Sequence, residues 1–271
     1  MVPRLDNDVY DRIGETWWEE DNPLAFLHGS MTTGRMQYFR AVLTRLGCLP
    51  TDERHPTALD VGSGGGFLAE EFCRLGFTVT GVDPSQVSVS SAAAHAARTG
   101  LDIDYRIGTG ERLPVDDASM DVAYCSDVLE HVQDVEQVLA ETARALKPGG
   151  IYLFDTLNRT LLSKVLTKAS QQWRLTRVVD FTLHDWTAFL RPDELAEHLL
   201  RHGLTMQETV GLGPRAKPWT VAAGILQLRR GRLSYRQLSE RLEFDRVRPK
   251  SLSYMGFALK EHAVLQKAAG D

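Results

Sequence analysis

The sequence contains few cysteines and no long apolar run. Its 271 residues include only Cys48, Cys73 and Cys125, which lie far apart and form no Cys-x-x-Cys pair. Neither a disulfide framework nor a cysteine zinc site is therefore expected. No stretch approaches the ~18 apolar residues of a membrane-spanning helix. The N-terminal residues lack the apolar core of a signal peptide, so we expect a cytoplasmic protein.

An excess of positive charge is also missing. Thirty-one lysines and arginines face 36 aspartates and glutamates, which gives a formal net charge of -5. No global basic field argues for nucleic acid, so we expect no nucleic-acid partner. Hydrophobic residues make up 43% of the chain and charged residues 25%, which is typical of a globular protein with a sizeable core.

Strand-like and helical patterns alternate from residue 57 to residue 156. Helical spacing follows the first strand, and further helices are predicted at about 86–99 and 134–146. The predicted strands are short apolar runs at 57–61, 77–82, 102–107, 120–125 and 151–156. This alternation indicates βαβ units and a parallel sheet.

The flanking segments follow a different pattern. Residues 9–46 are predicted to be helical, 158–190 to form two helical pieces, and a further helix begins near 191. An arginine-rich segment at 214–250 resembles an insertion before a final strand at about 253–259. We therefore expect a helical cap over residues 1–55. Residues 56–271 then form the main domain, with a lid at about 158–190 and the insertion at about 214–250.

A glycine-rich turn, Gly62-Ser63-Gly64-Gly65-Gly66, separates the first strand from the first helix of this region. Glycine allows close approach of a ligand to the backbone and positive φ angles. No Gly-Lys-Ser/Thr follows, which disfavours a P-loop, and Phe67 breaks the Gly-x-Gly-x-x-Gly spacing. The turn therefore indicates either a site that binds a nucleotide-like ligand or a loop that binds no ligand.

The second strand ends in Asp83-Pro84-Ser85. A carboxylate at this position can accept both ribose hydroxyls of a nucleotide. The alternative is that Asp83 caps the following helix, with Pro84 in the first turn.

Five segments of the chain occur in the order and spacing of class I S-adenosylmethionine (SAM)-dependent methyltransferase motifs. They are Leu59–Gly66, Gly81–Ser85, Gly108–Pro114, Ala123–Val132 and Leu146–Gly150. This resemblance implies a Rossmann-like, seven-stranded, mostly parallel α/β sheet with helices on both faces. It also implies SAM as cofactor and a small-molecule acceptor as partner. The implied cofactor-binding residues are Asp60, Gly62, Ser63, Gly64, Asp83, Pro84, Ser85, Gly110, Glu111 and Ser126. Thr109 stands where many relatives have an aspartate that contacts adenine.

A narrower resemblance is to ubiquinone-biosynthesis O-methyltransferases, which methylate catechol-type hydroxyls on polyprenyl rings. It is carried by Trp17-Trp18, Leu27-His28 followed by Arg35, Asp155–Arg159, His184-Asp185-Trp186 and Phe189–Leu195. In that family the residue matching Arg35 binds cofactor, and a guanidinium can pair with the methionine carboxylate. The alternative is a solvated arginine on a cap helix.

Acceptor chemistry is predicted at Asp127-Val128-Leu129-Glu130-His131. On a helix, Asp127, Glu130 and His131 share one face and could hold Mg²⁺ or manganese, as the matching residues do in ubiquinone-type relatives. The alternative is that the segment only shapes the cofactor pocket. His131 is the first candidate for the base that deprotonates the acceptor, with His184 and His28 in reserve.

Residues 158–180 interleave Arg and Lys with Leu, Val and Trp. Such a basic amphipathic segment either contacts an anionic membrane surface or forms a lid over the site. The sequence as a whole predicts an O-methyltransferase acting on a small aromatic or prenylated hydroxyl compound. A C- or N-methyltransferase and a noncatalytic cofactor-binding scaffold are the alternatives, and no oligomeric state is indicated.

Overall fold

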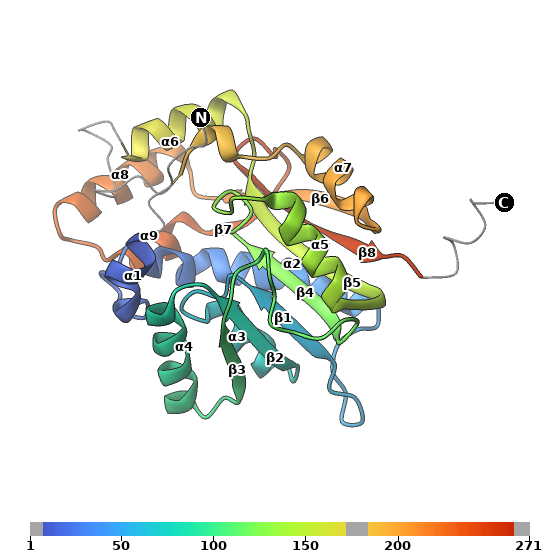
Figure 1. Ribbon diagram of the computed structural model, residues 1–271. Coiled ribbons are helices and arrows are strands. Elements are labelled where there is room, and N and C mark those ends of the chain that lie inside the picture. Colours follow the sequence, from blue (N-terminus) through green and yellow to red (C-terminus); the bar gives the residue numbers. More distant parts are fainter. Residues whose placement is uncertain (1–7, 172–183, 263–271) are drawn as a thin grey trace.

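The computed structural model describes residues 8–171 and 184–262. Its centre is one eight-stranded sheet in the order β3-β2-β1-β4-β5-β8-β6-β7 (Figure 1). Strands β1 to β5 pair in parallel, whereas β8 runs antiparallel to β5 and β6, and β7 runs antiparallel to β6. The mostly parallel Rossmann-like sheet is confirmed, with one more strand than the seven expected.

The strands are β1 (Thr57–Val61), β2 (Thr78–Asp83), β3 (Ile103–Ile107), β4 (Met120–Ser126), β5 (Leu146–Leu157), β6 (Leu204–Pro214), β7 (Phe244–Val247) and β8 (Ser253–Lys260). The six strands predicted individually all occur. Five match their expected bounds to within one residue, whereas β5 begins at Leu146 instead of at residue 151. The additional strand is β7. It forms because the end of the 214–250 segment pairs with β6.

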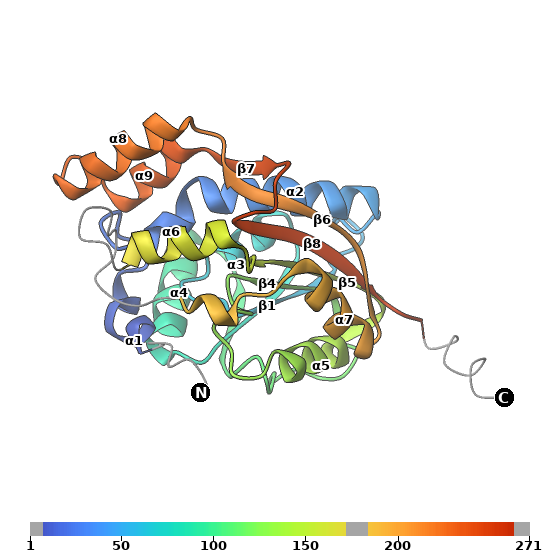
Figure 2. The same ribbon diagram turned by 90° about the horizontal axis from the view of Figure 1, so that it is seen from above.

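Helices cover both faces of the sheet. On one face, α2 (Thr32–Arg45) and α3 (Phe67–Arg74) pack aromatic and aliphatic side chains, such as Phe39 and Phe72, on the strands. On the other face, α5 (Val135–Ala145) and α7 (Pro192–Arg201) bury Leu139 and Leu195. Helix α4 (Gln86–Thr99) contacts β2 and β3 (Figures 1 and 2).

The N-terminal segment and the lid region contain short helical elements. The first comprises α1 (Val9–Ile13), η1 (Gly14–Thr16) and the π-helical turn η2 (Leu27–Met31). The second comprises α6 (Leu161–Gln171) and η3 (Trp186–Ala188). The predicted second helical piece of 158–190 falls largely on 172–183, outside the described residues.

The 214–250 segment forms a helical hairpin, α8 (Pro218–Arg229) and α9 (Tyr235–Leu242), before β7. Local chemistry explains its ends: Pro218 begins α8, and Ser234 and Gln237 form a capping box at the start of α9. Among the described residues, no helix combines the length and apolar character needed to cross a bilayer.

Candidate active site

The predicted site residues gather where the parallel strands end. The glycine-rich turn follows β1, Asp83 ends β2, the 108–111 segment follows β3, and Ser126 ends β4. Because parallel strands present their carboxyl ends at one edge of the sheet, ligands of such folds bind there.

The glycine-rich turn is held in place by β2. The N–H groups of Gly62 and Ser63 donate to the carbonyl of Val82 at 2.8 and 3.0 Å. Gly62, Gly64 and Gly66 have positive φ angles of 76°, 50° and 85°. A Cβ atom on Gly62 would also collide with Val128, so glycine serves both the backbone turn and close packing.

Asp83 holds the glycine-rich turn and the start of α4. It is 9% exposed, and its two carboxylate oxygens accept the N–H groups of Gly64 at 2.8 Å and Ser85 at 2.9 Å. Burial raises the pKa of Asp83 to about 6. The cap of α4 is Ser85, whose hydroxyl accepts the N–H of Ser88, so the interpretation of Asp83 as a helix cap is wrong. Pro84 lies exposed between Asp83 and this cap.

The remaining cofactor candidates border the same turn. Asp60 is 3% exposed, accepts the N–H of Ala69, and has a raised pKa because of burial and the nearby charge of Asp83. Gly110 lies against Val138 of α5. A carboxylate oxygen of Glu111 accepts the N–H of Gln133 at 3.2 Å, which ties the segment after β3 to the segment after β4.

Two tryptophans of the N-terminal segment pack on the glycine-rich turn. Trp17 is 4% exposed, and its Nε1 donates to the hydroxyl of Ser88 at 3.0 Å. A Cβ atom on Gly64 or Gly65 would lie 2.9 or 2.5 Å from the Trp17 side chain. Trp18 donates to the carbonyl of Gly65 at 3.0 Å. The two tryptophans therefore pack the N-terminal segment on the turn.

Trp18 also joins a polar cluster beneath the turn. Its ring stacks on His95, with 3.4 Å between centroids and 3° between planes. His95 contacts the fully buried carboxylate of Glu70 at 2.5 Å, and Arg74 ion-pairs with the other oxygen of Glu70. The contacts of Trp18 therefore connect the N-terminal segment to both α3 and α4.

Arg35 is a buried residue of α2. It is 3% exposed, donates to Asp155 from Nε at 3.1 Å and Nη2 at 2.9 Å, and also ion-pairs with Asp127. The alternative of a solvated arginine is wrong. The guanidinium joins the ends of β4 and β5, and its predicted pairing with the methionine carboxylate stays a prediction.

The segment after β4 is a turn rather than the expected helix. Asp127 has a φ angle of 53°, and the helix α5 begins only after Asp134, whose carboxylate caps it. The predicted helical face of Asp127, Glu130 and His131 therefore does not exist. Asp127 ion-pairs with Arg35, and His184 takes the third place in the cluster.

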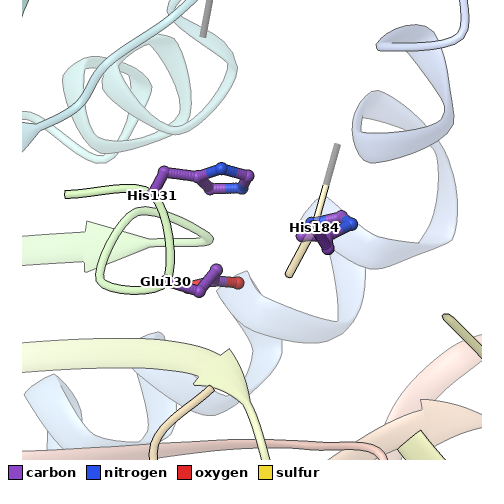
Figure 3. Close-up of side chains that lie close together, drawn as sticks. All are labelled: Glu130, His131 and His184. Carbon is purple, nitrogen blue, oxygen red and sulfur yellow. The ribbon is translucent and has the colours of Figure 1, made fainter. Parts of the chain in front are cut away.

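Glu130, His131 and His184 form the cluster that the structure assembles. One side-chain ligand atom from each lies within 4.8 Å of the others, and Glu130 and His131 point toward His184 (Figure 3). The imidazole centroids are 4.9 Å apart. Glu130 is 1% exposed, and one of its oxygens accepts the hydroxyl of Thr156 at 2.7 Å.

Burial dominates the electrostatics of this cluster. It lowers the pKa of His131 to about 3 and of His184 to about 4, so both imidazoles are neutral at pH 7. Burial and the nearby Asp127 raise the pKa of Glu130 to about 8. Tyr10 of α1 meets the cluster, with its ring edge-on to His131 at 6.0 Å between centroids.

The donor set of this cluster suits a metal ion. Within the described part of the chain, Oε1 of Glu130 has no hydrogen-bond partner, although it is buried. Two imidazoles and one carboxylate are typical ligands of zinc, iron or manganese, whereas Mg²⁺ prefers oxygen ligands and retains several waters. Of the two ions expected from the sequence, the residues therefore fit manganese, a transition metal, better than Mg²⁺.

Two residues at the site, the buried Asp155 and the partly buried Tyr10, received no role in the sequence analysis. Asp155 is paired in register with Ser126 across β4 and β5, and Tyr10 lies in the N-terminal segment. Asp155 could have been identified from the sequence by its position near the end of the strand that follows β4. For Tyr10 no comparable signal exists, because only tertiary packing brings α1 to the cluster.

Known methyltransferases are similar to this chain in sequence. A methyltransferase domain family matches residues 59–154. A ubiquinone biosynthesis O-methyltransferase of Methylobacterium nodulans is 36% identical over 81% of this chain and 91% of its own length. One from Caulobacter vibrioides is 39% identical over 75% and 82%.

Solved structures support the fold. A SAM-dependent methyltransferase from Thermotoga maritima has a TM-score of 0.60 at 19% identity, with 93% of this chain and all of that chain covered. Magnesium protoporphyrin IX methyltransferase from Synechocystis, solved with S-adenosylhomocysteine bound, has a TM-score of 0.54 at 18% identity, with 84% of each chain covered. The chain is a SAM-dependent methyltransferase, and it belongs to the ubiquinone biosynthesis O-methyltransferase family.

Proposed function

We propose that the protein transfers the methyl group of SAM to a hydroxyl oxygen of a catechol-type aromatic acceptor that carries a prenyl chain. The observation that carries this proposal is the buried cluster of Glu130, His131 and His184 beside the predicted cofactor residues. The name shared by the curated relatives supports oxygen as the methylated atom.

In this proposal, the cofactor half binds and orients SAM. Asp83 accepts the ribose hydroxyls on the lone pairs that Gly64 and Ser85 leave free. The methionine part lies along Asp60 and the Gly62–Gly64 turn. The sulfonium is already activated, so the protein must chiefly align acceptor oxygen, methyl carbon and sulfur.

The acceptor hydroxyl must lose its proton before or during transfer. A phenol has a pKa of about 10, roughly seven units above that of His131, so proton transfer to this imidazole alone costs about 10 kcal/mol. His131 is therefore a poor base by itself. The neutral imidazoles of His131 and His184 are instead suited to accept a hydrogen bond or ligate a cation.

Glu130, His131 and His184 would hold a divalent transition-metal ion. When bound there, such an ion would lower the pKa of a neighbouring hydroxyl and offset negative charge beside it. Thr156 orients Glu130 through their hydrogen bond. The Arg35–Asp127–Asp155 group fixes the turn that carries Glu130 and His131.

The flanking segments complete the site in this proposal. Residues 1–55 act as a cap, because Trp17 and Trp18 pack on the glycine-rich turn and the hydroxyl of Ser85 donates to Asp11 at 2.5 Å. The 158–190 lid brings His184 to the cluster. The 214–250 insertion forms the outer α8–α9 hairpin.

Methyl transfer to a prenylated catechol tests the proposal. Purified protein is dialysed against EDTA and assayed with labelled SAM, alone and after addition of zinc, manganese or magnesium. We expect an O-methylated product, with activity restored by manganese or zinc more than by magnesium. His184→Ala should lower activity, whereas the exposed control His55→Ala should not. Methylation at carbon or nitrogen, or SAM binding without transfer, would contradict the proposal.

A further inference from the structure

Tyr10 of α1 lies between the two halves of the site. On one side, the carboxylate of the next residue, Asp11, accepts the hydroxyl of Ser85 at 2.5 Å, and Ser85 follows Asp83 by two residues. On the other side, the Tyr10 ring is edge-on to His131, with 6.0 Å between centroids and 86° between planes. Helix α1 also contacts α4, which follows β2 (Figures 1 and 2). Tyr10 therefore joins the end of β2 to the turn after β4.

The electrostatics of Tyr10 agree with this position. Burial raises the pKa of Tyr10, and the charges of Asp127, Glu130 and Asp83 raise this pKa further. Asp127 and Glu130 lie in the turn after β4, whereas Asp83 ends β2. Carboxylates from both halves of the site are therefore close enough to act on this phenol.

Trp17 supports the Tyr10 ring from behind. The two rings are parallel, with 6.1 Å between centroids and 4° between planes. Trp17 is itself fixed, because it is 4% exposed, donates to the hydroxyl of Ser88 and packs edge-on against Phe67 at 5.6 Å between centroids. A ring that is supported in this way loses little conformational freedom when a ligand binds beside it.

We propose that the ring of Tyr10 recognises the positive charge of the SAM sulfonium. The inference rests on the proposed function for the place of this charge, because the methyl donor must lie between the cofactor residues and the acceptor cluster. Tyr10 reaches both sets of residues. The face of an aromatic ring carries partial negative charge and attracts a cation.

Recognition of the charge distinguishes the cofactor from the product it becomes. S-adenosylhomocysteine (SAH) carries a neutral thioether where SAM carries the sulfonium. A ring that attracts the cation strengthens SAM binding without strengthening SAH binding, which favours exchange of the spent cofactor. A ring that only covered the site would act equally on both ligands.

Calorimetric titration of the full-length protein with SAM and with SAH, without acceptor, tests the proposal. The readout is the ratio of the Kd for SAH to the Kd for SAM. Tyr10→Leu should lower this ratio about fivefold, whereas Tyr10→Phe retains the ring and should keep the wild-type ratio. Phe26→Leu is the matched control, because it removes an aromatic ring of the same N-terminal segment that packs edge-on against Phe244 instead.

A fluorinated ring serves as a second test if Tyr10→Leu loosens the N-terminal segment. Pentafluorophenylalanine at position 10 has nearly the shape of phenylalanine, but its fluorine atoms withdraw electron density and reverse the charge of the ring face. We expect this variant to have a lower ratio than Tyr10→Phe, with SAH affinity close to that of Tyr10→Phe.

Two results would overturn the proposal. One is an equal loss of SAM and SAH affinity in Tyr10→Leu together with an unchanged ratio in the fluorinated variant, which leaves Tyr10 a structural role only. The other is a ratio that already falls in Tyr10→Phe, because the hydroxyl would then be the recognising group.

Methyl transfer to a water-soluble catechol separates this inference from the proposed function. Transfer by the wild type, with the same ratio in all ring variants, removes only the role of Tyr10. A ratio that falls as expected, in a protein that transfers no methyl group to a hydroxyl, removes only the proposed function.

Discussion

At the scale of single residues, Asp83 is the side chain for which we predict the largest effect on cofactor binding. Its carboxylate fixes the turn through Gly64 and leaves acceptor capacity for a ribose. Hydrogen bonds to a charged group contribute about 1.5–3 kcal/mol each. Asp83→Ala should therefore weaken SAM binding roughly 10- to 100-fold in calorimetric titration. The exposed Asp104→Ala serves as control, and unchanged affinity of Asp83→Ala would exclude the ribose role.

The raised pKa of Asp83 predicts a pH dependence of the same affinity. Above a pH of about 6 Asp83 is ionised and accepts hydroxyl hydrogens, whereas below it the carboxyl binds a proton. SAM affinity should fall roughly tenfold for each pH unit below that value if only the ionised form binds. Calorimetry across this range checks the profile, and Asp83→Asn should flatten it. A wild-type profile already flat from about pH 5 to about pH 7 would contradict the assignment.

Replacing Arg35 distinguishes a structural role of this side chain from a role in cofactor binding. Removing the guanidinium leaves the buried Asp155 and the partly buried Asp127 without their partner, and breaking a buried ion pair typically costs about 3–5 kcal/mol. Arg35→Met should therefore lower the free energy of unfolding by about this amount in denaturant titration. Arg40→Met, at an exposed position of the same helix, is the control. A stable Arg35→Met variant that has lost SAM affinity would instead favour pairing with the methionine carboxylate.

At the scale of elements, the N-terminal segment is held on the glycine-rich turn mainly by its two tryptophans. Trp17→Ala removes the ring that packs on Gly64 and Gly65, so the segment should open locally without global unfolding. We expect faster limited proteolysis before residue 31 and SAM binding weakened about tenfold, which is ~1.4 kcal/mol. Trp219→Ala, at an exposed position of α8, is the control. Unchanged proteolysis and affinity would show that the segment is not part of the cofactor site.

The turn after β4 shows where prediction from sequence failed. Asp127, Glu130 and His131 have helical spacing. However, Asp127 has a positive φ angle, and the next helix begins only after its cap at Asp134. His184 reaches the cluster across more than fifty residues of sequence, and no local pattern encodes that contact. The strands and helices of the βαβ units were predictable, because local apolar runs and the glycines that end them determine these elements.

At the scale of the whole molecule, the sheet places the cofactor residues at one edge regardless of the segments that surround it. The expected order of the motifs was therefore sufficient to predict the common location of Asp60, Asp83 and Ser126. The extra strand β7 was not predictable, because four residues paired with β6 resemble any short loop in an arginine-rich insertion. The same holds for Tyr10, which reaches the cluster only through tertiary packing.

The central claim is that Glu130, His131 and His184 act on the acceptor rather than on the cofactor. The most direct test measures kcat for methyl transfer to a catechol and the Kd for SAM in wild type, Glu130→Gln and His184→Ala. We expect a large loss of kcat in both variants, with SAM affinity close to that of wild type. Wild-type kcat, or a loss confined to SAM affinity, would contradict it.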